Sequence, residues 1–196
     1  MSETNLQERS VIWNADKISD AVVSVRNSLI EGYLEYQKAY PDTPLALIGI
    51  RTGGAHLAQR LKQPIEAALK QNVSLGILDI TLYRDDMLTG KARHIPLLKG
   101  THIPFDLEGA YVVLIDDVLF TGRTIRSALD ALTDLGRPAS IRLGILVDRG
   151  HRELPIQSDH CGGQLSTGRT QNIKLHLTEE GHEEDVLWSY QEGVSR

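Results

Sequence analysis

The segment VVLIDDVLFTGRT, at residues 112–124, decides our prediction of the fold because it joins a strand to a helix through an acidic pair. Its apolar start predicts a strand over 111–116 that is buried on both faces. Asp116 and Asp117 then fall at the carboxyl end of that strand. A helix is predicted over about 124–135, where Gly136 and Pro138 end it.

Strands and helices alternate on both sides of this segment. The helical spacing of apolar residues predicts one helix that opens at Asp16 and ends before Pro41, and another that follows Gly53 and Gly54. Short apolar runs predict strands at 45–50, 73–83 and 140–148, with two more at 173–177 and 185–190. This alternation predicts a single-domain α/β fold over 1–196, with a parallel sheet covered by helices on both faces. Ligands bind such sheets at the carboxyl ends of the strands.

Two parts of the opening segment predict that it binds a phosphorylated sugar. Backbone N–H groups at a helix start bind phosphate with the help of the helix dipole, and Gly122 lets the backbone come close. Thr121 and Thr124 add hydroxyl donors, and the acidic pair one loop away would accept hydrogen bonds from sugar hydroxyls. A phosphate at one end and a diol at the other describe ribose 5-phosphate. The alternative is a capped helix after a chance acidic pair, but the combination of both parts in this order favours the functional interpretation.

The segment VVLIDDVLFTGRT resembles the phosphoribosyl diphosphate (PRPP) signature of the type I phosphoribosyltransferases. The stretches DITLYRDD at 79–86, LGRPASI at 135–141 and LVDRGHRELPI at 146–156 resemble the narrower PyrR family of pyrimidine operon regulatory proteins. This resemblance extends from about residue 18 to the C-terminus and implies the type I phosphoribosyltransferase fold. The core is then expected over about 17–150, the hood over about 148–172 plus N-terminal residues, and the flexible loop over about 83–105.

The glycine pair after the strand at 45–50 marks a second expected phosphate site. Residues 49–54 have the glycine spacing of a P-loop, but Ala55 and His56 replace its Lys and Ser/Thr, which argues against an ATPase. The resemblance implies a loop that faces the diphosphate and often carries a non-proline cis peptide; it comprises Arg51, Thr52, Gly53 and Gly54. The alternative is an ordinary glycine start of a helix.

The resemblance also implies the roles of individual residues. The catalytic residues are expected to be Asp116, Asp117, Arg84 and Arg51, and the 5-phosphate site Thr121, Gly122, Arg123 and Thr124. Arg84 lies in the flexible loop, whose closure over PRPP would exclude water. Backbone groups suit the alternating carbonyl and N–H groups of uracil, and those expected to bind it belong to Val147, Asp148, Arg149 and Gly150. Mg²⁺ is the expected cofactor, held through PRPP with Asp116 and Asp117 as the nearest protein ligands.

The composition limits the location and the partners. There is one cysteine, Cys161, so an internal disulfide is impossible and a cytoplasmic location is expected. We find no signal peptide and no apolar run long enough to cross a membrane. The formal net charge is −5, and Gln157 and Gly163 stand where the RNA-binding members of the family commonly have cations. Because phosphate contacts dominate RNA affinity, the loss of cations predicts weak binding of leader RNA.

The sequence therefore predicts a uracil phosphoribosyltransferase that converts uracil and PRPP to UMP and diphosphate. We favour this prediction over a role as a regulator of the pyrimidine operon. One alternative is a UMP-sensing, RNA-binding attenuation regulator with weak catalysis. Another is an enzyme of the same fold that acts on a purine base or on orotate. The resemblance also implies a homodimer or a higher homo-oligomer, and no membrane partner is expected.

Overall fold

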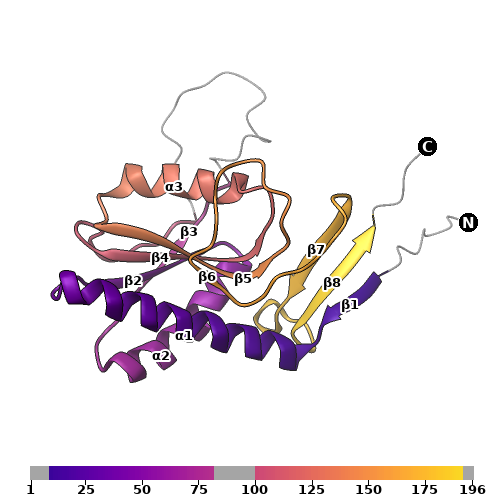
Figure 1. Ribbon diagram of the computed structural model, residues 1–196, viewed down its shortest axis with the longest axis horizontal. Helices are drawn as coiled ribbons and strands as arrows, with labels where there is room; N and C mark the ends of the chain where they lie inside the picture. The colour runs from indigo at the N-terminus through magenta and orange to yellow at the C-terminus, as the bar shows by residue number, and fades with distance from the viewer. Residues whose placement is uncertain (1–8, 82–99, 192–196) are drawn as a thin grey trace, which may run out of the picture.

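The computed structural model describes residues 9–81 and 100–191, which form two sheets and three long helices (Figure 1). The larger sheet has the strand order β3-β2-β4-β5-β6, and the smaller has the order β1-β8-β7. The helices are α1 (Ala15–Ala39), α2 (Gly53–Leu69) and α3 (Arg123–Leu135), with a 3-10 turn η2 (Thr178–Glu180). The strands are β1 (Arg9–Trp13), β2 (Leu45–Ile50), β3 (Ser74–Leu78), β4 (Tyr111–Leu119), β5 (Ser140–Asp148), β6 (His160–Cys161), β7 (Gln171–His176) and β8 (Val186–Gln191).

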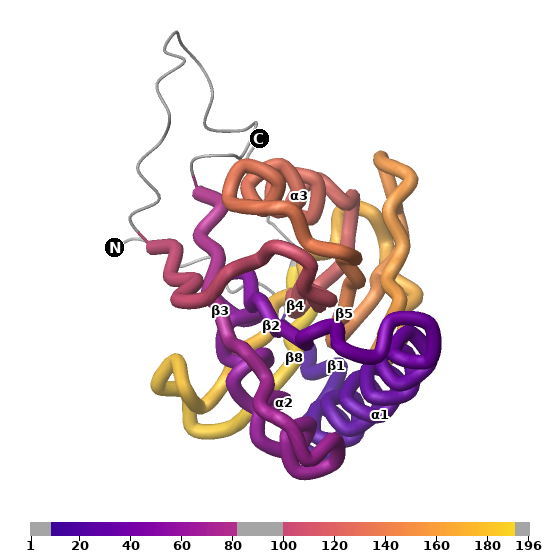
Figure 2. Tube along the Cα trace, turned by 90° about the vertical axis from the view of Figure 1, so that its left-hand side faces the viewer, coloured from indigo at the N-terminus to yellow at the C-terminus, as the bar shows by residue number. Residues whose placement is uncertain are grey.

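The larger sheet is parallel and forms the middle layer of the molecule. Leu45 of β2 pairs with Tyr111 of β4, which in turn pairs with Ser140 of β5. The helices α1 and α2 lie on one face and α3 on the other, as the two views at right angles agree (Figure 1, Figure 2). The predicted α/β fold, with a parallel core sheet flanked by helices, is confirmed.

Alternate side chains of the central strands enter two separate hydrophobic cores. Leu47, Val113 and Ile115 pack in the cluster that includes α1 and α2. Ile48, Val112 and Leu114 pack in the cluster that includes α3. Because both faces of the strand are buried, β4 needs apolar residues at every position of its first half, which explains its continuous apolar run.

Strand β4 is longer than the sequence predicts. It extends to Leu119, not to residue 116, because Val118 and Leu119 continue the pairing with Val147 and Asp148 of β5. Asp116 and Asp117 therefore lie inside the strand. The short strands β1 and β6 were absent from the prediction, since the five residues of β1 and the two of β6 carry no clear apolar alternation.

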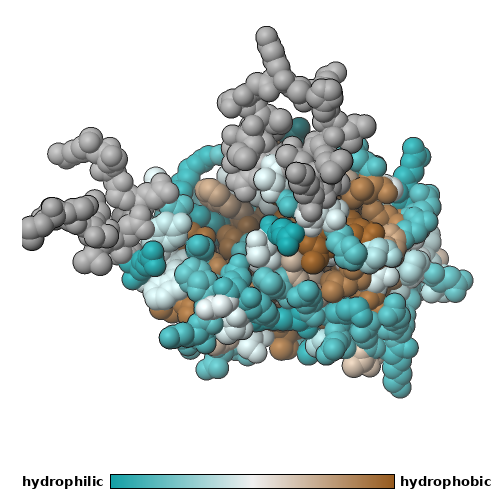
Figure 3. All heavy atoms as spheres, turned by 180° about the vertical axis from the view of Figure 1, so that it is seen from behind, coloured by the Kyte–Doolittle hydropathy of each residue, from teal (hydrophilic) through white to brown (hydrophobic). Residues whose placement is uncertain are grey.

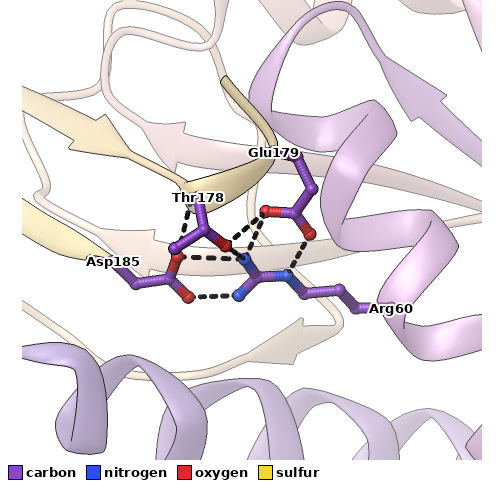
Figure 4. A network of polar contacts seen from close by, with 4 residues as sticks. All are labelled: Arg60, Thr178, Glu179 and Asp185. Atoms are coloured by element: carbon purple, nitrogen blue, oxygen red, sulfur yellow. Dashed lines mark hydrogen bonds and ion pairs between the residues drawn. The ribbon is translucent and has the colours of Figure 1, made fainter. Parts of the chain in front are cut away.

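The smaller sheet joins the two ends of the described chain. Arg9 in β1 lies opposite Tyr190 in β8, and β8 pairs antiparallel with β7. The turn between β7 and β8 is attached to α2 by Arg60, whose guanidinium binds the carboxylates of Asp185 and Glu179 (Figure 4). The hydrogen bond to Asp185 is the main cause that raises the pKa of Arg60 above its usual value, and the hydrogen bond to Glu179 is the next. The smaller sheet is thus fixed to the helix whose first residues form the expected diphosphate loop.

The surface mixes polar and apolar residues. Figure 3 shows the face opposite to that of Figure 1, where hydrophilic residues dominate the lower part and hydrophobic residues gather higher up. Large exposed hydrophobic residues are Val11, Val23, Leu34, Tyr40 and Leu135. Within residues 9–81 and 100–191, no helix is long and apolar enough to cross a membrane.

The close approach of α2 to β4 gives the first testable prediction. A Cβ added at Gly54 would lie 2.3 Å from the carbonyl oxygen of Ile115 and 3.0 Å from the Cα of Asp116, both backbone atoms of β4. Gly54→Ala should therefore lower the free energy of unfolding by about 1–3 kcal/mol, measured by urea denaturation. The control is Gly168→Ala, because nothing lies within 4 Å of its added Cβ. Equal stability of the two variants would contradict the packing described here.

Candidate functional site

Three loops meet at the carboxyl edge of the larger sheet. Strand β4 lies between β2 and β5, so the loops that follow these three strands are neighbours. Residues 51–54 follow β2, and residues 149–155 follow β5. The acidic pair lies in the last part of β4, and residues 120–124 follow it as a turn that leads into α3. A Cβ added at Gly53 would lie 2.6 Å from Oδ2 of Asp117, so the two expected phosphate loops are joined through the acidic pair.

The acidic pair is folded into a place that disfavours negative charge. Asp116 is buried and Asp117 is half-buried. The backbone N–H of Asp117 donates to Oδ1 of Asp116 at 3.0 Å, and the N–H of Val118 donates to Oδ1 of Asp117 at 2.8 Å. Burial raises the pKa of both carboxyls, and the charge of Asp117 raises that of Asp116 further. A bound group that carries hydroxyls or positive charge would relieve this cost, which suits a site for a sugar diol.

The turn before α3 has the geometry of a phosphate site. Gly122 has φ 92°, a left-handed conformation that favours glycine, and helix α3 begins at the next residue. The N–H groups of the first turn of α3 and the positive end of its dipole therefore face the loop. The carbonyl of Thr121 accepts hydrogen bonds from the N–H groups of Glu153 and Leu154, at 2.9 and 3.2 Å. The segment after β5 thus holds the phosphate turn in place.

The side chain of Arg123 makes an ion pair next to this turn. Its Nε donates to Oε2 of Glu153 at 2.8 Å, and Glu153 also binds Arg169. The hydrogen bond from Arg123, with the positive charges of both arginines, lowers the pKa of Glu153. Of the expected 5-phosphate residues, Thr121, Gly122 and Thr124 lie at the turn, whereas the guanidinium of Arg123 points to Glu153.

The expected diphosphate loop has an unusual backbone. The peptide bond between Arg51 and Thr52 is cis, as the family resemblance implies. Nη1 of Arg51 donates to the carbonyl of Gly100 at 3.2 Å, and the N–H of Arg51 donates to the carbonyl of Leu78 at 2.9 Å. The loop is therefore tied both to β3 and to residue 100. Arg84, the other expected catalytic arginine, lies outside the described residues, as do residues 83–99 of the expected flexible loop.

Arg149 occupies the turn expected to bind the base, but its side chain serves the protein interior. The residue is 5% exposed, and its guanidinium donates to the hydroxyl of Thr167 and to the carbonyls of Gly168 and Gln171, at 3.3, 3.0 and 2.5 Å. It also lies over the ring of Phe120, 4.1 Å from its centroid. Burial lowers the pKa of Arg149. Arg149 thus connects the segment before β7 to the residue that precedes the phosphate turn.

Arg152 fixes the same turn from its other side, a role that the sequence did not indicate. Its Nε donates to the carbonyl of Ile156 at 2.8 Å, and its Nη1 donates to that of Phe120 at 2.8 Å. It also binds the carboxylate of Asp148, whose other oxygen accepts from the N–H of Gly150 at 2.8 Å. The only sequence signal is the proximity of two arginines to an aspartate, which equally fits a solvated turn.

A cavity of about 460 Å³ opens beside this turn, within the size range of small-molecule sites. It is lined by polar residues from the turn and from the segments that follow it: Asp148, Gly150, Arg152, Gln157, Ser158 and Gln164, with Leu165. The carboxyl edge therefore combines two phosphate-type turns, an acidic pair and a polar cavity.

Comparisons with known proteins agree with this geometry. Residues 14–176 match the family described as Phosphoribosyl transferase domain. The Bifunctional protein PyrR of Listeria welshimeri is 44% identical over 183 residues, which cover 93% of this chain and 97% of that protein. The protein of the same name from Elusimicrobium minutum is 50% identical over 145 residues, which cover 74% and 80%. The hypoxanthine phosphoribosyltransferase of Trypanosoma cruzi has a similar fold, with TM-score 0.66 over 93% of this chain and 97% of that chain, at 16% identity.

The contact between Arg149 and Phe120 gives a second testable prediction. Arg149→Met should destabilise the protein by about 1–3 kcal/mol, because it removes the hydrogen bonds of a charged donor to the carbonyls of Gly168 and Gln171. Combined with Phe120→Leu, a double-mutant cycle should give a coupling energy of about 0.5–2 kcal/mol. The four proteins would be compared by urea denaturation. Strictly additive effects would show that the guanidinium and the ring do not interact.

Proposed function

This chain belongs to the phosphoribosyltransferases and, within them, to the PyrR family, and on that premise we propose that it converts uracil and PRPP to UMP and diphosphate. The observation that carries the proposal is the contact between Gly53 and Asp117. It brings the expected diphosphate loop and the expected diol-binding pair to one point, one turn away from the expected 5-phosphate site.

Each part of the carboxyl edge has a role in this proposal. The first turn of α3, with Thr121, Gly122 and Thr124, holds the 5-phosphate through backbone N–H and hydroxyl groups. Asp116 and Asp117 accept hydrogen bonds from the ribose hydroxyls. The N–H groups of residues 52–54 and the guanidinium of Arg51 face the diphosphate in this proposal, and Arg84 contacts the diphosphate as it is released. Arg123 contributes once its guanidinium leaves Glu153.

The reaction itself needs positioning and electrostatic stabilisation. The bond between C1 of the ribose and the diphosphate oxygen breaks, and its electron pair leaves with the diphosphate. N1 of uracil forms the new bond to C1, and its proton passes to the departing diphosphate or to water, so that UMP and diphosphate result. Positive charge develops on the ribose as the bond breaks, and the carboxylates of Asp116 and Asp117 stabilise it without forming a covalent bond. The raised pKa of the pair reflects the same burial that strengthens its field.

The donor set fits magnesium bound together with substrate. The described ranges contain no cluster of three or more His, Cys, Asp or Glu side chains that would hold a metal alone. Mg²⁺ commonly binds through one or two carboxylates plus substrate phosphates and water, which Asp116, Asp117 and PRPP would supply. When bound there, it would offset the negative charge of the diphosphate.

The base is recognised at the turn after β5 in this proposal. Asp148 and Gly150 line the 460 Å³ cavity, and Val147 precedes them as a buried residue of β5. The side chain of Arg149 is engaged elsewhere. Competition between uracil, hypoxanthine, guanine and orotate in the PRPP assay decides between this base and the alternatives. We further propose that the enzyme works in the cytoplasm as a homodimer or a higher homo-oligomer, as the family resemblance implies.

Asp117→Asn tests the role of the acidic pair. With uracil, PRPP and Mg²⁺, UMP formation should fall by about 10²–10³-fold, because a charge-stabilising group is lost.

The same variant tests the effect of burial on stability. Burial raises the pKa of Asp117 above 3.8, so ionisation at neutral pH weakens the folded state. The variant should therefore melt at a higher temperature near neutral pH, and the gain should vanish as the pH falls to about 4. Exposed Asp42→Asn is the control and should change neither quantity. Undiminished turnover in Asp117→Asn would remove this residue from the mechanism.

RNA-dependent regulation is the second candidate function, because the similar proteins are named bifunctional. The charges of the first helix oppose it, because α1 carries more acidic than basic residues: Asp16, Asp20, Glu31 and Glu35 against Lys17, Arg26 and Lys38. Arg152 is engaged with Asp148 and with backbone carbonyls, and Gln157 and Ser158 beside it are neutral. These observations favour the enzyme over the regulator.

Titration with pyrimidine leader RNA separates these two functions. We expect a dissociation constant above about 1 μM at physiological salt, no tighter than for an unrelated RNA of equal length, since few phosphate contacts are available. Gln157→Arg, which adds a cation at the edge of the turn, should tighten binding and steepen its salt dependence. Sub-micromolar binding to wild type that UMP strengthens would instead support the regulator.

A further inference from the structure

A carboxylate of the protein lies beside the expected 5-phosphate site and already binds a cation there. Glu153 belongs to the segment after β5, and its backbone N–H donates to the carbonyl of Thr121 at 2.9 Å. Its Oε2 accepts a hydrogen bond from Nε of Arg123 at 2.8 Å. Arg123 is the first residue of α3 and directly follows Gly122. The guanidinium that starts the phosphate-binding helix is therefore held by an anion of the chain itself.

The position of Arg123 calls for an anion. The start of a helix carries the positive end of the helix dipole, so a cation there is disfavoured unless a negative charge lies near it. The first turn of α3 contains no acidic residue, and Glu153 supplies this charge from 30 positions further along the chain. The hydrogen bond from Arg123 is the main cause that lowers the pKa of Glu153, so the carboxylate is ionised at neutral pH. A phosphate bound at the same turn would offer Arg123 an anion of the same kind.

A second arginine makes the exchange of one anion for the other feasible. Oε1 of Glu153 binds Nη2 of Arg169, while Oε2 binds Arg123. If Arg123 turns to a phosphate, Glu153 therefore keeps a partner and is not left as an unpaired charge. The side chains of Arg123 and Arg169 are 58% and 63% exposed, so the guanidinium of Arg123 can move without disturbing either hydrophobic core.

The strengths of the two contacts favour this exchange. An ion pair between exposed side chains is weak, because water screens it and two long side chains must be ordered. A phosphate carries more charge than a carboxylate and offers a guanidinium several oxygens in a bidentate geometry. The ligand should thus displace Glu153 from Arg123, at the loss of a small part of its binding affinity.

We propose that Glu153 is a positioning residue that competes with the 5-phosphate for Arg123. It holds the guanidinium while no ligand is bound and releases it to the phosphate of the incoming sugar phosphate. The inference rests on the proposed function, which assigns the 5-phosphate to the turn before α3, and adds the residue that controls when Arg123 takes part. Because the competition lowers the affinity for every ligand with a 5-phosphate, it also favours release of UMP.

Calorimetric titration of the full chain with UMP and with ribose 5-phosphate tests the competition. Glu153→Gln should bind both ligands about two- to fivefold more tightly than wild type at low salt, because Arg123 is no longer held. The gain should shrink as the salt concentration rises, since exposed charges are screened. When Arg123→Gln is already present, Glu153→Gln should change neither affinity, because Glu153 acts through that guanidinium.

Glu35→Gln is the matched control. It also removes one negative charge from an exposed ion pair, the one with Lys38, but it does so on α1 beside Tyr111 at the start of β4. This variant should bind both ligands as wild type does.

Three outcomes would overturn the competition and leave the proposed function standing, provided that wild type binds UMP. They are equal or weaker binding by Glu153→Gln, an equal gain in Glu35→Gln, and an equal gain when Arg123→Gln is present. The last outcome would mean that the charge of Glu153 acts on the ligand directly. Failure of wild type to bind either ligand would overturn the 5-phosphate site itself, and this inference with it.

Discussion

The packing of the start of α2 against β4 is the constraint on which the rest of the site depends. Gly54 lies so close to the backbone of Ile115 and Asp116 that no side chain fits between them, and Gly53 lies against the carboxylate of Asp117. This contact sets the distance between the expected diphosphate loop, residues 51–54, and the acidic pair. Strand pairing between β2 and β4 brings the two segments to the same edge, and the glycines allow them to touch.

That close packing has a cost in the acidic pair. Two neighbouring carboxyls are held in a setting that raises the pKa of each, because burial disfavours their charged forms and the charge of Asp117 further disfavours that of Asp116. Ionised carboxylates at such a site make the fold less stable than neutral residues would, and in the proposed function they bind the ribose hydroxyls and stabilise positive charge. Stability and function therefore oppose each other at Asp116 and Asp117.

Arginine side chains hold the surrounding segments on this core. Arg60 fixes the turn of the smaller sheet to α2, while Arg149 and Arg152 join the segment after β5 to Phe120, just before the phosphate turn. In each case the guanidinium binds several acceptors that are far apart in the sequence. These cations are engaged in contacts within the fold, and the chain as a whole has an acidic balance. Both observations support the proposal that the chain binds leader RNA weakly.

The sequence alone determined the alternation of strands and helices, the acidic pair with the phosphate turn after it, and the glycine loop after β2. These features are local, since each is written in consecutive residues whose burial or backbone geometry restricts their type. The tertiary structure alone decided that Gly53 contacts Asp117, that Arg149 turns away from the base turn to Phe120, and that β4 continues through the acidic pair. It also placed His160 beside Ser28, 132 positions away in the chain. Such contacts depend on how distant segments pack, and the identity of a single residue does not reveal its partner.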